Sequence, residues 1–246
     1  MLRFLRLIVG VLLLPLCVAV TVALLDTLRS IPNTGMLLSA ETRALLVGYF
    51  LWICMWFLMP QPVRVYVVAH ELTHALWGLL FGARVSQFRV SNRGGSVRLS
   101  KSNFLITLAP YFFPFYTILV VVLRFLLSFI FTPIPFPLFW LFLVGLTWSF
   151  HATFTLHSLM TTQQPDIHEY GKVFSYAIIY LFNLAGIGLW VVCTTTASFD
   201  TLTAALACHS VETYRNTAEV IIRYTSKLRQ TVPPLLKTLF YVSKPS

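Results

Sequence analysis

Charged residues, and acidic residues above all, are scarce in this sequence. Only 11% of its 246 residues are Asp, Glu, Lys or Arg, and eight of these are acidic. A soluble domain carries roughly 25% charged residues. With 57% hydrophobic residues and a mean hydropathy of +0.79, the chain is too apolar to fold in water. The scarcity of charge therefore excludes an ordinary soluble domain and indicates that lipid surrounds most of the chain.

Cysteine is sparse as well, and its spacing has no known metal or disulfide pattern. The four cysteines are far apart and form no CxxC pair: Cys17, Cys54, Cys193 and Cys208. This spacing supports neither a disulfide framework nor a thiolate zinc site. We interpret these cysteines as small apolar side chains that pack among other apolar residues.

Basic residues outnumber acidic ones and give the chain a formal net charge of +10. They gather at 84–101 and in the C-terminal tail: Arg84, Arg89, Arg93, Arg98 and Lys101, then Arg215, Arg223, Lys227, Arg229, Lys237 and Lys244. Both regions flank predicted membrane segments, where anionic lipid headgroups attract cations. No stretch outside the apolar segments interleaves basic and aromatic residues. We therefore expect the lipid bilayer, and no nucleic acid, as the partner of these charges.

Long apolar stretches dominate the rest of the sequence. Six of them approach or reach the ~20 residues that a helix needs to cross a bilayer: about 4–25, 44–60, 63–82, 104–131, 138–160 and 173–195. The first follows Arg3 and Arg6 as in a signal peptide, but it has no small-x-small cleavage site before Asp26, so we expect a retained span. Pro110 and Pro114 predict a kink in the fourth.

The expected fold is an all-α polytopic membrane protein with about six transmembrane helices. Residues 1–196 are predicted to form the membrane core, and residues 197–246 an amphipathic basic tail that lies on the membrane surface. The basic residues do not decide the orientation in the membrane, because they lie at both predicted sides.

One segment, about 84–101, has the period of a strand. Phe88 and Val90 alternate with polar residues, a second alternating run follows, and Gly94 and Gly95 stand between the two. This pattern predicts a β-hairpin directly after the helix at 63–82. In a membrane protein such a hairpin must lie at the interface or be buried against protein, because its edges need hydrogen-bond partners.

The helix at 63–82 carries the sequence HELTH, an HExxH motif formed by His70, Glu71 and His74. Residues four apart share one face of a helix, so both imidazoles can bind one Zn²⁺ ion. Glu71 lies beside them and can act as a general base towards a water molecule. A chance HExxH is expected in roughly one such sequence in two hundred. Burying Glu71 in an apolar helix costs a few kcal/mol, which favours a functional site.

Catalytic zinc usually has three protein ligands and one open position, so a third ligand must come from elsewhere in the chain. The candidates lie within or just after the fifth span: His151, His157, Asp166, His168 and Glu169. Alternating crossings place the segment around Asp166 on the same membrane side as the C-terminal half of the helix at 63–82. This favours Asp166, with His157 and Glu169 as rivals.

These motifs together resemble the site-2 protease family of intramembrane zinc metalloproteases, in particular its short bacterial branch. The resemblance rests on AHELTHAL in an apolar helix, the Gly-Gly hairpin after it, LAPYFFP in the next span and a later Pro-Asp pair. It covers roughly residues 60–180. Family members often have glycine after the aspartate, whereas this chain has Ile167.

The resemblance implies a role for each matching residue. His70, His74 and Asp166 would bind Zn²⁺, Glu71 would be catalytic, and the hairpin at 84–101 would help to present an unwound substrate helix. It also implies an integral, multi-pass protein of a bacterial inner or cell membrane.

The expected function is that of a zinc metalloendopeptidase that cleaves a membrane-anchored protein substrate in or near the bilayer. Two alternatives stay open. One is a non-proteolytic membrane protein, such as a scaffold or chaperone, that retains a metal site. The other is a different membrane metalloprotease with Glu169 as its third ligand. The substrate, any regulator and the oligomeric state are not indicated by the sequence.

Overall fold

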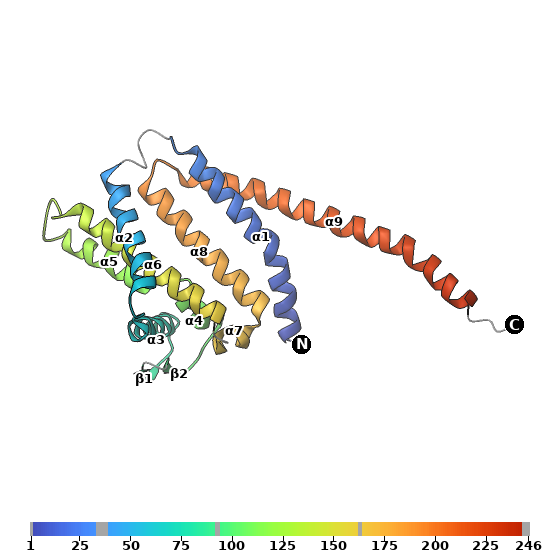
Figure 1. Cartoon of the computed structure of the whole chain (residues 1–246), viewed down its shortest axis with the longest axis horizontal. Helices are drawn as coiled ribbons and strands as arrows, with labels where there is room; N and C mark the ends of the chain where they lie inside the picture. Colours follow the sequence, from blue (N-terminus) through green and yellow to red (C-terminus); the bar gives the residue numbers. More distant parts are fainter. Residues whose placement is uncertain (1, 33–38, 92–93, 162–163, 243–246) are drawn as a thin grey trace. The chain divides into compact units, whose positions relative to one another are not determined.

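The structure is a computed structural model that describes residues 2–32, 39–91, 94–161 and 164–242, with side chains described as far as residue 228 (Figure 1). Arg93 and Lys244 lie outside the described residues, as do the side chains of Arg229 and Lys237. The chain divides into two compact units. The first contains residues 1–11 and 32–183, and the second contains residues 12–31 and 184–246.

The first unit holds most of the helices and the only sheet in the described part of the chain. Its elements, in chain order, are the start of α1 (Leu2–Ser30), α2 (Ala40–Leu58), α3 (Val63–Leu80), β1 (Val85–Ser91), β2 (Gly94–Leu99), α4 (Phe104–Leu108), the 3₁₀ helix η2 (Ala109–Tyr111), α5 (Phe115–Leu127), α6 (Pro137–Thr161), α7 (Pro165–Tyr170) and the first half of α8 (Lys172–Thr194).

Four helices, α1, α2, α6 and α8, are long and apolar enough to cross a membrane. A fifth span results if the bent pair made by α4–η2 and α5 counts as one. The prediction of about six spans is therefore corrected to four or five among the described residues. The difference lies at 63–82, because α3 combines Arg64 with the polar HELTH sequence and is therefore not among the helices that are apolar enough to cross a membrane.

The predicted kink at Pro110 and Pro114 is confirmed as a sharp bend. The axes of Phe104–Tyr111 and Phe115–Leu127 differ by 85°. Neither proline has an N–H to donate, so the helix cannot continue through them. The bend matters for the site because it leaves the short α4 beside α3 instead of extending it into a long helix.

Helices α2 and α6 pack with their backbones in direct contact. A Cβ atom on Gly48 would overlap the carbonyl oxygen of Phe142, and one on Gly145 would overlap that of Leu45. Small residues at such crossings let two helices approach closely in lipid. The neighbouring aromatic residues then form a buried cluster: Trp52, Phe150 and Phe154. This cluster fixes α6, whose C-terminal end leads into α7.

The hairpin lies where the sequence predicts it, and its two strands are antiparallel. One detail is corrected, because Gly94 and Gly95 do not lie between the strands. They belong to β2 and pair with Ser91 and Val90, while residues 92–93 lie outside the described part.

The hairpin packs on α3, and this close packing requires a glycine on the helix. A Cβ atom on Gly78 would lie 2.9 Å from the side chain of Leu99.

The second unit contains the rest of α1 and α8 together with α9 (Phe199–Val242). His209 of α9 lies 2.8 Å from the Asp26 carboxylate of α1, and the Tyr214 hydroxyl donates to the carbonyl of Leu12 at 2.7 Å. Beyond these contacts, most described side chains of α9 are exposed. The division into a core of 1–196 and a surface tail of 197–246 stays a prediction.

Candidate metal centre

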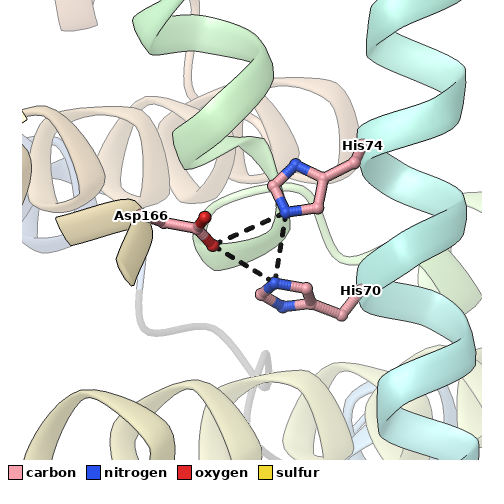
Figure 2. A group of neighbouring side chains, drawn as sticks. All are labelled: His70, His74 and Asp166. Carbon is pink, nitrogen blue, oxygen red and sulfur yellow. Dashed lines mark hydrogen bonds and ion pairs between the residues drawn. The ribbon is translucent and has the colours of Figure 1, made fainter. Parts of the chain in front are cut away.

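His70 and His74 lie on one face of α3, and their rings point toward the same place (Figure 2). Their Nε2 atoms are 3.2 Å apart. The Nδ1 atom of His74 lies 2.9 Å from the carbonyl oxygen of Ile106 in α4. Because a carbonyl only accepts hydrogen bonds, Nδ1 carries the proton and Nε2 is left to bind a metal ion.

Asp166 of α7 points toward the two histidines from the other side (Figure 2). Its Oδ2 atom lies 3.4 Å from Nε2 of His70 and 3.5 Å from Nε2 of His74. Zinc with bonds of about 2.0–2.1 Å in a tetrahedron separates neighbouring ligand atoms by about 3.3 Å. The three measured separations match one face of such a tetrahedron, so His70, His74 and Asp166 can hold one metal ion without rearrangement.

The donor set indicates which ions fit. Two imidazoles and one carboxylate suit zinc and related transition metals, whereas calcium and magnesium prefer ligand sets made of oxygen atoms. All three donors line the cavity described below, which leaves room for a further ligand such as water. Burial by itself would raise the pKa of Asp166, but interactions with His70 and His74 outweigh burial and hold this pKa below its usual range. The carboxylate is thus ionised, as a metal ligand must be.

Two tyrosines support the donors, and the sequence patterns assigned a role to neither. The hydroxyl of Tyr111, a fully buried residue, donates to Oδ2 of Asp166 at 3.0 Å. The hydroxyl of Tyr66 lies 3.4 Å from Nδ1 of His70. Partners of this kind orient metal ligands. Tyr111 could have been predicted from the sequence, because it is the one hydroxyl-bearing aromatic residue in LAPYFFP. Tyr66 could have been predicted from its position one helical turn before His70.

Glu71 is almost fully buried, with 7% of its surface exposed, and its neighbours belong to the hairpin. The backbone of Val97 hydrogen-bonds to its carboxylate. Gly95 lies directly over it, since a Cβ atom there would be 2.5 Å from Cγ and 2.8 Å from Oε1 of Glu71. Strand β2 therefore fixes where the carboxylate can lie, and the missing side chain of Gly95 makes the room that it occupies.

A cavity of about 960 Å³ opens beside these residues. The two histidines, Glu71 and Asp166 line it together with the whole of β2, residues 94–99. His157 and Glu169, the rivals for the third ligand, also line this cavity but do not belong to the group that can hold the ion. The cavity is large enough for a segment of polypeptide.

His151 has no part in the donor group either. It is buried in α6, and its Nε2 atom has no hydrogen-bond partner among the described residues.

Comparison of the chain with protein-family models, with curated proteins and with solved structures gives no match. The resemblance to the site-2 protease family stays a prediction from the motifs.

Proposed function

We propose that this chain is an intramembrane zinc metalloendopeptidase that cleaves a peptide bond in or near the bilayer of a membrane-anchored protein substrate. The observation that carries the proposal is the arrangement around Asp166. Three donors from two distant elements lie 3.2–3.5 Å apart, and a glutamate follows the first histidine at the edge of the same cavity. A site that only stores or transports a metal ion has no use for this glutamate.

Each residue has a chemical task in this proposal. His70, His74 and Asp166 hold the zinc ion, and when bound the ion supplies a water acidified to a pKa of about 7 and polarises the scissile carbonyl. Glu71 takes the proton of the attacking water and passes it to the departing amine. Tyr111 and the Ile106 carbonyl keep Asp166 and His74 in the orientation that binds the ion.

The hairpin supports a peptide substrate in particular. A helix hides its carbonyl groups, so a membrane-anchored substrate must unwind before a nucleophile can reach it. Within the described part of the chain, strand β2 pairs with β1 along one edge and with no strand along the other, and its residues line the cavity. Its other edge can pair with an extended substrate segment through backbone hydrogen bonds. An extended segment held there lies beside Glu71.

The close approach of Gly95 to Glu71 gives a test of this arrangement. In Gly95→Ala the new methyl group must push the Glu71 carboxylate aside, so we expect cleavage to fall by about tenfold or more. Zinc affinity should stay near that of the wild type, because none of the three donors moves. The matched control is Gly186→Ala in α8, where an added Cβ meets no atom within 4 Å. Equal cleavage rates for both variants would show that β2 does not position the base.

Metal removal tests the function itself. The full chain, reconstituted in lipid vesicles with a model single-span substrate, should lose cleavage when a chelator removes the metal. Cleavage should return when zinc is added in stoichiometric amount. Metal content measured by elemental analysis should follow activity, with one zinc per chain at full activity. Cleavage that persists in the metal-free protein would refute the proposal. A protein that binds zinc tightly and cleaves no membrane-anchored substrate would favour the scaffold alternative.

A further inference from the structure

The first ten described residues of α1, positions 2–11, belong to the same compact unit as the candidate metal centre. Within this stretch only Arg6 and Gly10 are not exposed. They are four residues apart and therefore share one face of the helix. Both contact the chain immediately after Asp166, which makes this face of α1 part of the surroundings of the site.

The contacts of Arg6 are directed at the end of α7. Its guanidinium donates to the carbonyl oxygen of Glu169 at 2.7 Å and lies 4.3 Å from the ring centre of Tyr170. Arginine suits this double task because its planar group can donate a hydrogen bond and stack on an aromatic face at once. Glu169 is three residues after Asp166, so Arg6 holds the short helix that carries the third donor.

Gly10 brings α1 against the start of α8 at backbone distance. A Cβ atom there would lie 2.7 Å from the nitrogen and 2.9 Å from Cα of Phe174. Phe174 and Tyr170 both contact the ring of Phe104 in α4, at 5.6 and 6.5 Å between ring centres. Since α4 also supplies the carbonyl that orients His74, one packed group connects α1 to both sides of the metal centre.

We propose that residues 2–11 of α1 act as a brace for the metal-ligating segment, with Arg6 as a positioning residue for Asp166. This proposal rests on the proposed metal site, but what it describes is how residues 2–11 hold α7 in place. It also gives Arg6 a task in the folded protein.

The test uses the full chain in lipid nanodiscs and compares Arg6→Ala, Arg6→Lys and Arg3→Ala. Arg3 is the matched control, because it lies on the same helix and is exposed. The first measurement is hydrogen–deuterium exchange of the metal-free protein. Arg6→Ala should speed exchange of the amides of 167–171 by about fivefold or more, with exchange in α6 unchanged. Arg3→Ala should behave as the wild type.

The second measurement is zinc affinity, together with the visible spectrum of the cobalt(II)-loaded protein, which reports coordination geometry. Arg6→Ala should weaken zinc binding by about tenfold, the lower end of the range for groups that orient a ligand. It should also change the cobalt spectrum, whereas Arg6→Lys should recover part of both properties. As a second variant, Gly10→Ile should have the effect of Arg6→Ala, because its side chain meets backbone atoms.

The two proposals fail in different ways. If Arg6→Ala leaves exchange in α7 unchanged, the brace is refuted whatever the metal measurements show. If the wild type binds no zinc while Arg6→Ala still loosens α7, the brace holds and the zinc site is refuted.

Discussion

Glu71→Gln is expected to bind zinc as tightly as the wild type and to cleave the substrate about 10²–10⁴ times more slowly. This is the range that a positioned general acid or base contributes. Glutamine has the shape of glutamate and can keep its place under Gly95, but its amide cannot accept a proton from water. The measurement is the initial rate of cleavage in vesicles, together with the zinc content of the same preparation.

Glu169→Gln is the matched control for this experiment. Glu169 also lines the cavity, yet Asp166 and not Glu169 completes the donor group. Its replacement should leave both zinc content and cleavage close to the wild type. The proposed mechanism is wrong if Glu71→Gln retains zinc and still cleaves at the wild-type rate. A loss of activity only in Glu169→Gln would favour the architecture in which that glutamate is the third ligand.

Asp166→Ala is expected to weaken zinc binding by more than about a hundredfold. Even groups that merely orient a ligand contribute 10–100-fold to metal affinity, and Asp166 would be a ligand itself. The remaining pair on α3, His70 and His74, leaves two coordination positions without protein donors. Cleavage should be lost in parallel, and excess zinc should restore only a small part of it. Competition titration with a fluorescent zinc chelator measures the affinity directly.

Three further variants test whether the loss of zinc binding is specific to the Asp166 carboxylate. Asp200→Ala removes an exposed carboxylate from α9 and should change nothing. His157→Ala and Glu169→Ala test the rival ligands and should bind zinc as the wild type does. Full zinc occupancy in Asp166→Ala, with a loss in His157→Ala or Glu169→Ala, would move the third ligand to that residue.

The local part of the site could be predicted from the sequence because it depends on one helix. HELTH places His70 and His74 four residues apart, and helix geometry alone then directs both rings to one side. The hairpin was similarly predictable, since its alternation has period two. Local patterns did not give the register of Gly94 and Gly95, because pairing of the strands decides whether glycines lie in a turn or in a strand.

The third donor needed more than local patterns. The order of predicted spans placed the segment around Asp166 on the same side as the C-terminal half of the helix at 63–82, but it could not separate Asp166 from Glu169 in that segment. The structure separates them by position: Oδ2 of Asp166 lies 3.4 Å from Nε2 of His70, whereas Glu169 lines the same cavity outside the donor group. These positions depend on how α7 packs, which no sequence period records.

The number of spans was overestimated for a related physical reason. The helix α3 reads as apolar because valine and leucine surround HELTH, yet His70, Glu71 and His74 of this motif face the cavity. Its buried polar surface is explained by neighbouring protein, namely the hairpin and α4. A sequence period shows that one face differs from the other, but it does not show whether lipid or protein covers each face.

The spacing of the donors along the chain has a consequence for stability. His74 and Asp166 are separated by roughly ninety residues, so an ion bound to both closes a long loop of the chain, as a disulfide bond does. An ion that binds only the folded protein stabilises it by about 2.7 kcal/mol when its concentration is a hundred times its dissociation constant. Loss of the ion would then release α7 from α3 before it affects the contact of α2 with α6. In that case proteases would cleave the metal-free protein most readily in the part of the chain between α3 and α7.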